Sequence, residues 1–127
     1  MAQHEGGTRR RRHTRRLKKL FPLHIRSVVN YDTQGLYSTT EYQIAQDMTD
    51  ILVNACWMHT RQHSACTDIV DGTAGIGGNT LSFSTMFRHV NALELDYGRW
   101  ILLNANMKKL GLDTTVDSIH GNFITFF

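Results

Sequence analysis

The sequence predicts an α/β protein built on a parallel sheet, and two observations carry this prediction. From residue 67 onward, short apolar segments alternate with segments whose apolar residues recur at helical spacing. A turn that holds four glycines follows the first short segment. Alternating strands and helices imply parallel strands joined by right-handed crossovers. The expected strands are residues 67–71, 89–95 and 116–120, and the expected helices between them are residues 78–87 and 97–110.

A further helix is expected upstream of the sheet. Thr40 and Gln43 form a capping box, in which the hydroxyl accepts from a free backbone N–H and the glutamine reaches back. This helix is expected to end near residues 59–63. The apolar residues that recur at helical spacing along it are Ile44, Met48, Ile51, Leu52, Ala55 and Cys56.

Charge divides the 127-residue chain into unequal parts. Residues 1–19 hold eight basic side chains against one acid, Glu5, whereas residues 20–127 hold six basic and ten acidic side chains. Residues 1–20 are expected to form a disordered tail because they have almost no apolar content. A connecting segment over residues 21–37 and a ligand-binding domain over residues 38–127 are expected to follow. The basic residues of the tail are Arg9, Arg10, Arg11, Arg12, Arg15, Arg16, Lys18 and Lys19.

Composition excludes several classes of protein. No apolar run approaches the ~18 residues of a membrane span, and none resembles a secretory signal. An intracellular protein, nuclear or cytoplasmic, with no membrane partner is therefore expected. Cys56 and Cys66 are too few for a disulfide framework and are expected to be thiols in a reducing compartment. His59, His63 and Cys66 have a spacing that suits zinc, but no fourth ligand is evident and no metal site is expected.

The turn Asp71-Gly72-Thr73-Ala74-Gly75-Ile76-Gly77-Gly78-Asn79-Thr80 holds the residues of greatest chemical interest. In parallel sheets, ligands bind beyond the carboxyl ends of the strands, where glycines allow a ligand to approach the backbone. Thr80 stands where the dinucleotide-binding pattern has its third glycine, and the phosphate-binding Gly-Lys-Ser/Thr pattern is absent. Asp71 suits a cationic ligand end and would repel a pyrophosphate.

Polar residues also follow the other two predicted strands. Glu94 ends the second strand, where a carboxylate can accept hydrogen bonds from ribose hydroxyls. Asp96 is expected to be the N-cap of the next helix. Asn122 follows the third strand, where a polar side chain can reach an adenine edge. Together with the glycine-rich turn, these residues predict a nucleoside cofactor.

This arrangement resembles class I S-adenosylmethionine-dependent methyltransferases, which have a Rossmann-like fold. Within that class it resembles most the trimethylguanosine synthase family, which methylates the exocyclic N2 of an RNA cap guanosine. The resemblance covers roughly residues 36–123 and rests on three blocks, residues 37–45, 70–80 and 90–96. It implies S-adenosyl-L-methionine as the cofactor and capped RNA as the substrate.

The resemblance also implies roles for individual residues. Asp71 would bind the amino end of the methionine moiety, Ser38 and Thr40 would reach its carboxylate, and Glu94 would hold the ribose. The other cofactor-binding residues that it implies are Gly72, Thr73, Ala74, Gly75, Gly77, Gly78, Asn79, Thr80, Leu95 and Asn122. Asn122 stands where the family has Asp, whose contact with the adenine amino group an amide oxygen can still make.

One part of the family pattern is absent. The family positions its target amine with a Pro-Pro-Trp-type loop after the fourth strand, and the only proline here is Pro22, so no catalytic residue is assigned. With three strands, residues 67–71 would form an exposed apolar edge, which folded proteins usually avoid. An incomplete Rossmann-like fold is therefore expected, as a fragment, a truncated chain or a half-domain completed by a partner chain.

The sequence thus favours an S-adenosylmethionine-dependent RNA methyltransferase that acts on the N2 of the cap guanosine. Two alternatives stay open. One is a methyltransferase of the same fold that acts on ribosomal RNA guanine or DNA adenine. The other is a non-catalytic homologue that binds RNA through its basic tail. For the tail itself, RNA contact is favoured, and a nuclear import signal or no defined role remains open.

Overall fold

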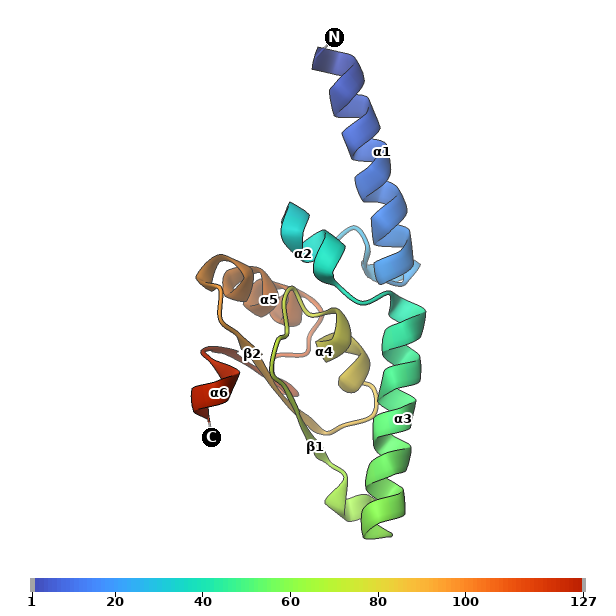
Figure 1. The fold of residues 1–127 in the computed structure, drawn as a ribbon, viewed down its shortest axis with the longest axis vertical. Helices are drawn as coiled ribbons and strands as arrows, with labels where there is room; N and C mark the ends of the chain where they lie inside the picture. Colours follow the sequence, from blue (N-terminus) through green and yellow to red (C-terminus); the bar gives the residue numbers. More distant parts are fainter. Residues whose placement is uncertain (1, 127) are drawn as a thin grey trace.

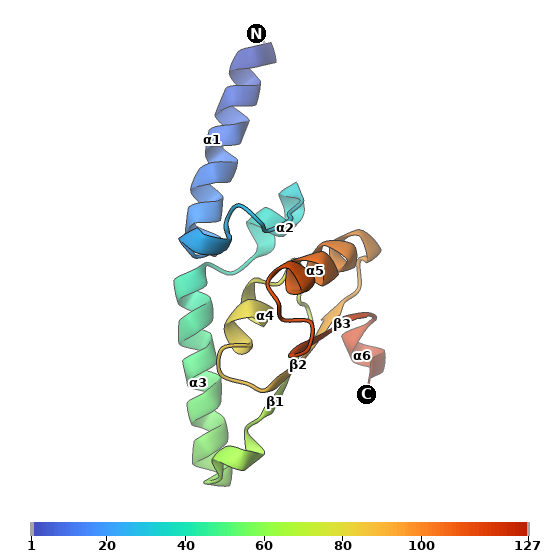
Figure 2. The same ribbon diagram turned by 180° about the vertical axis from the view of Figure 1, so that it is seen from behind.

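The computed structural model describes residues 2–126, and Met1 and Phe127, the outer ends of the predicted tail and domain, lie outside them. Three parallel strands form one sheet in the order β1-β2-β3. The elements are α1 (Ala2–Leu20), η1 (Leu23–Ile25), α2 (Thr33–Ser38), α3 (Tyr42–Thr60), η2 (His63–Ala65), β1 (Asp68–Asp71), α4 (Gly78–Phe83), β2 (His89–Glu94), α5 (Tyr97–Lys109), β3 (Val116–His120) and α6 (Phe123–Phe126). The predicted incomplete Rossmann-like α/β fold is confirmed (Figures 1 and 2).

The main core lies between the sheet and helices α4 and α5. Ile69, Val90 and Val116 occupy one row across the three strands, so the same face of each strand carries a β-branched apolar residue. Phe83 of α4 and Met107 of α5 are buried in the same cluster. These contacts explain why the helical and strand periodicity downstream of residue 67 predicted the elements there so closely.

A second core cluster joins the N-terminal segment to the domain. Its buried members are Leu20, Phe21, Ile25, Val29, Leu36 and Ile76. Ile76 lies within the glycine-rich turn and is fully buried. Asn106 of α5 adds polar contacts, because its amide donates to the carbonyls of Asn30 and Ile76 and accepts from the N–H of Asn30. Several of residues 21–37 are therefore packed into the folded body, and the division of the chain into a tail, a connecting segment and a domain stays a prediction.

Helix α1 differs from the disorder expected for residues 1–20. Its N-terminal part points away from the sheet (Figure 1), but its last turn is docked, because Leu20 is buried in the second cluster. Arg16, predicted as a phosphate contact, instead donates to the carbonyls of Leu36 (3.1 Å) and Thr39 (2.9 Å) and lies 3.5 Å from the carboxylate of Glu41. Arg16 is therefore a clamp between α1 and the chain around α2. The sequence signal was charge, which does not distinguish these two roles.

The capping box expected at Thr40 does not form. Helix α3 begins at Tyr42 with Glu41 as its N-cap, and no side chain caps it. Gln43 donates to Asp47, four residues on, instead of reaching back. Thr40 lies too far before the first turn to cap it.

Helix α3 buries a neighbouring face to the one that its apolar periodicity predicts. Its buried side carries Ala45 and Thr49, and the Thr49 hydroxyl hydrogen-bonds Ser82 of α4 at 2.6 Å. The large apolar residues Ile44, Met48, Ile51 and Leu52 are exposed. Small and hydroxyl-bearing residues pack here because the two buried hydroxyls satisfy one another.

The two cysteines form a disulfide, so the expectation of free thiols is wrong. Arg61 ends α3 in the left-handed conformation, and the short η2 helix returns the chain toward α3. The Cα atoms of Cys56 and Cys66 are 6.0 Å apart, within the usual range for a disulfide. Beside it, the His63 ring stacks on Trp57 with centroids 4.2 Å apart.

Two features are absent from residues 2–126. Within them, no three His, Cys, Asp or Glu side chains are grouped as a metal ion would require. Of the helices there, none combines the length and apolar content needed to cross a membrane.

The burial of α2 and the orientation of α3 predict unequal effects of two truncations. Leu36→Ala should lower the free energy of unfolding by about 2–5 kcal/mol, because Leu36 is fully buried and its removal leaves a cavity. Ile51→Ala should change it by no more than about 0.5 kcal/mol, because Ile51 is 65% exposed. Urea titration followed by circular dichroism measures both. A large loss for Ile51→Ala would contradict the orientation of α3.

Candidate cofactor-binding site

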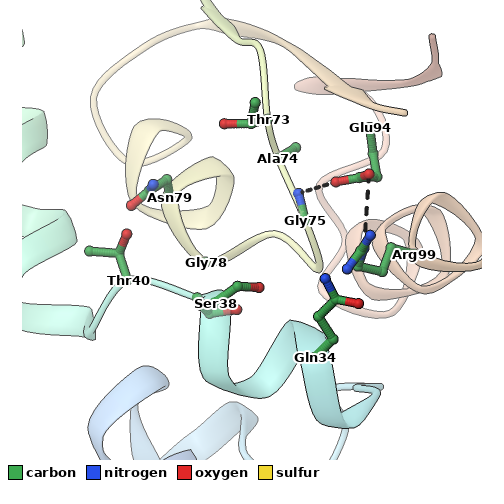
Figure 3. Close-up of a pocket in the computed structure, with 11 residues that line it drawn as sticks. Gln34, Ser38, Thr40, Thr73, Ala74, Gly75, Gly78, Asn79, Glu94 and Arg99 are labelled. Atoms are coloured by element: carbon green, nitrogen blue, oxygen red, sulfur yellow. Dashed lines mark hydrogen bonds and ion pairs between the residues drawn. The ribbon is translucent and has the colours of Figure 1, made fainter. Parts of the chain in front are cut away.

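A cavity of about 290 Å³ lies at the carboxyl ends of β1 and β2, at the lower end of the range for small-molecule sites. Three segments surround it: helix α2 with the residues that follow it, the glycine-rich turn, and the end of β2 with the first turn of α5 (Figure 3). Its lining residues are Gln34, Ser38, Thr39, Thr40, Thr73, Ala74, Gly75, Gly78, Asn79, Glu94 and Arg99. Eight of the predicted cofactor-binding residues are therefore brought together: Ser38, Thr40, Thr73, Ala74, Gly75, Gly78, Asn79 and Glu94.

Glu94 is the best-defined acceptor in this cavity. Its Oε1 accepts from the N–H of Gly75 at 3.0 Å, and its Oε2 accepts from the N–H of Asp96 at 2.8 Å. Arg99 approaches Oε2 at 4.0 Å (Figure 3). A carboxylate offers about four lone-pair sites, so each oxygen keeps capacity to accept from a ligand. The side chain is thus held in place by the chain and remains able to receive two hydroxyl donors.

The glycine-rich turn supplies shape and one unsatisfied acceptor. Gly75 has a φ of +58° and faces open space, so its glycine is required by backbone conformation and not by crowding. A Cβ at Gly78 would collide with the methyl group of Thr39. The Oδ1 atom of Asn79 is buried and has no hydrogen-bond partner among the described residues. The residues here fit a ligand that carries hydroxyl and amino donors, as S-adenosylmethionine does.

Asp71 has a supporting position beneath the turn and does not line the cavity. The hydroxyl of Thr80 donates to its Oδ2 at 2.8 Å. Burial raises the pKa of the Asp71 carboxyl above its usual value, and the charge of Glu94 adds to the rise, while hydrogen bonds from Thr80 and the Thr73 backbone oppose it. The buried carboxylate therefore connects the end of β1 with the start of α4.

The other predicted cofactor residues lie outside the cavity lining. Gly72 packs against the ring of Phe123, and Gly77 packs against Met107 and Leu103 of α5. Leu95 is 65% exposed beyond the end of β2. Asn122 is exposed after β3, and its Oδ1 accepts from the N–H of Ile124 at 2.9 Å, within α6. The roles implied for these residues stay predictions.

Three lining residues were absent from the sequence prediction, namely Gln34, Thr39 and Arg99. Arg99 could have been found, because Asp96 was expected to cap α5, and a residue three positions into a helix returns toward its N-cap. Asp96 does cap α5 by accepting from the N–H of Arg99. Gln34 and Thr39 gave no signal, because α2 was not expected to be a helix.

Comparison with known proteins finds a family match for the part of the chain that holds β1 to α6. Residues 66–127 match the family described as RNA cap guanine-N2 methyltransferase. The resemblance stated from the sequence is thereby confirmed over those residues. The glycine-rich turn, Glu94 and Arg99 all lie within the match, whereas α1, α2 and α3 lie outside it.

A curated relative also matches part of this chain. It is an uncharacterized protein of Acanthamoeba polyphaga mimivirus, 32% identical over an alignment of 97 residues. The alignment covers 65% of this chain and 38% of the relative. The chain therefore spans well under half the length of that relative.

The raised pKa of Asp71 predicts a pH-dependent effect of Asp71→Asn. The folded state binds the Asp71 proton more tightly than the unfolded state does, so Asp71 costs stability as the pH rises through the raised pKa. Asparagine keeps an acceptor for Thr80 without the buried charge. We expect the unfolding free energy of Asp71→Asn, relative to the parent chain, to increase between about pH 4 and pH 7. Urea titrations at both pH values measure this difference, and a decrease would refute the assignment.

Proposed function

We propose that this chain holds the S-adenosylmethionine-binding part of an RNA methyltransferase, and that the methyl group goes to the exocyclic N2 of the 7-methylguanosine cap. The observation that carries the proposal is the Glu94 carboxylate at the end of β2, held by two backbone N–H groups and facing a cavity that the glycine-rich turn lines. The family match over residues 66–127 supports the reaction class and the RNA cap as substrate.

The residues around the cavity would divide the work of binding the cofactor. Glu94 would accept hydrogen bonds from the ribose hydroxyls, and Asn79 Oδ1 would accept from an amino donor. Ser38 and Thr40 would donate their hydroxyls to the methionine carboxylate. The bound cofactor supplies an electrophilic methyl group. The chain contributes orientation, which is the main requirement for transfer to an exocyclic amine.

We also propose that a partner segment pairs with β1 at the edge of the sheet. β1 is an edge strand, and the exposed apolar residues of α3 lie on a helix that packs beside α4. We propose a strand that is apolar on both faces as the occupant. A second copy fits less well, because antiparallel pairing of two β1 strands would oppose Asp68 and Asp71. Sedimentation should therefore show a monomer that binds a hydrophobic dye, and a stable dimer would argue against this occupant.

Cofactor binding is tested by calorimetry with S-adenosylmethionine. Glu94→Gln should lower the affinity by about tenfold to a hundredfold, because hydrogen bonds to a charged acceptor contribute roughly 1.5–3 kcal/mol. Asp117→Asn is the matched control, since Asp117 is an exposed acid on β3 outside the cavity. Absence of binding at millimolar cofactor would favour the non-catalytic homologue. Equal affinity for Glu94→Gln and the parent would contradict the role proposed for Glu94.

The substrate is tested by methyl transfer from labelled cofactor to three acceptors, namely 7-methylguanosine-capped RNA, a ribosomal RNA fragment and DNA. Labelled N2-methylated cap guanosine is the expected product. Label on ribosomal guanine or on DNA adenine alone would replace the cap proposal with the corresponding alternative. The assay is informative only for a chain that has passed the calorimetric test.

A further inference from the structure

Helix α1 concentrates positive charge, and its residues 9–19 include no acid. Seven exposed basic side chains lie between residues 9 and 19, and Arg16 adds an eighth that is partly buried: the exposed ones are Arg9, Arg10, Arg11, Arg12, Arg15, Lys18 and Lys19. Pairs such as Arg11 with Arg15 are four residues apart, where like charges on a helix repel. An anionic partner would relieve this repulsion.

Part of this charge lines a groove between α1 and α2. The groove has a volume of about 260 Å³, and its lining residues are Arg12, Arg15, Arg16, Lys19 and Tyr37. Arg16 is already bonded to the carbonyls of Leu36 and Thr39, so the free cations are the other three. The groove therefore combines three available cations with one aromatic ring.

The aromatic ring is open to solvent and close to the cofactor cavity. Tyr37 is 51% exposed, and its ring makes an edge-to-face contact with His13 at a centroid distance of 6.3 Å. The next residue, Ser38, lines the cofactor cavity, as does Gln34 one turn earlier on α2. Helix α2 thus borders the basic groove and the cavity at once.

Hydrogen bonds from Arg16 link the basic groove on α1 to the cofactor cavity. Its guanidinium holds the carbonyl of Thr39, and the Thr39 methyl lies where a Cβ at Gly78 would be. A molecule bound on α1 is therefore held in a fixed relation to the glycine-rich turn.

We propose that the groove between α1 and α2 binds single-stranded RNA, with phosphates on Arg12, Arg15 and Lys19 and a base stacked on Tyr37, and leads the strand to the cofactor cavity. The part of this proposal in which the RNA strand reaches the cofactor cavity rests on the proposed function. Single-stranded RNA fits because unpaired bases can stack on an exposed ring while cations follow the backbone. Bases within a duplex are not free to do so.

The first test compares two variants that remove equal charge. RNA affinity is measured by fluorescence anisotropy with a labelled 12-nucleotide oligouridine, without cofactor. The groove variant carries Arg12→Gln, Arg15→Gln and Lys19→Gln, and the control carries Arg9→Gln, Arg10→Gln and Arg11→Gln. Glutamine keeps helix propensity close to that of Arg and Lys. We expect at least a tenfold loss for the groove variant and less than a threefold loss for the control.

The salt dependence of RNA affinity gives a second measurement on the same variants. Each phosphate contact to single-stranded RNA contributes about 0.7 to the slope of log affinity against log salt. The groove variant should therefore lose about 2 from the slope, and the control should lose less. Equal losses of affinity and slope in the two variants would mean attraction by net charge alone and would overturn the proposal.

The stacking contact is tested with Tyr37→Leu. A loss of about fivefold to a hundredfold is expected from the usual contribution of a stacked base. Tyr97→Leu is the matched control, because Tyr97 is a 60% exposed tyrosine on α5. An unchanged affinity for Tyr37→Leu, or equal binding of duplex and single-stranded RNA, would overturn the proposal. RNA binding is measured here without cofactor, so a negative calorimetric test with S-adenosylmethionine does not affect this result. A negative RNA-binding result likewise leaves the calorimetric test valid.

Discussion

The rest of this structure depends on how the glycine-rich turn is held. Glycines give a turn its shape but no contacts of their own, so other elements must fix it. Glu94 holds the N–H of Gly75, and the amide of Asn106 holds the carbonyl of Ile76. The Ile76 side chain is buried among residues of the N-terminal segment. Sheet, α5 and N-terminal segment therefore meet at one loop, and the cavity exists because they do.

This arrangement gives the N-terminal segment a direct part in the candidate site. Leu36 is fully buried, and burying it orients α2 so that Gln34 and Ser38 line the cavity. Arg16 adds hydrogen bonds that secure the same stretch from the other side. Four of the eleven lining residues thus lie outside the matched family region, while the acceptor Glu94 lies inside it.

Electrostatics explains why the two acids near the turn behave differently. Asp71 is buried beneath the turn, so it connects β1 with α4 through Thr80 and carries a raised pKa. Glu94 has backbone donors and Arg99 around it and also faces the cavity. In the sequence, both residues are acids at the ends of predicted strands, and the resemblance implies a cofactor contact for each. Glu94 lines the cavity and Asp71 does not, so Glu94 carries the functional proposal.

The sequence by itself determined the sheet and its crossovers, because alternating strands and helices leave few parallel arrangements, and it located the turn and Glu94 through glycine spacing and strand ends. The tertiary structure alone decided which face of α3 is buried, since the Thr49–Ser82 hydroxyl pair outweighs the apolar stripe that includes Ile51. It also decided that Arg16 clamps α1, and that Cys56 reaches Cys66. Such outcomes depend on partners distant in sequence, which local spacing does not encode.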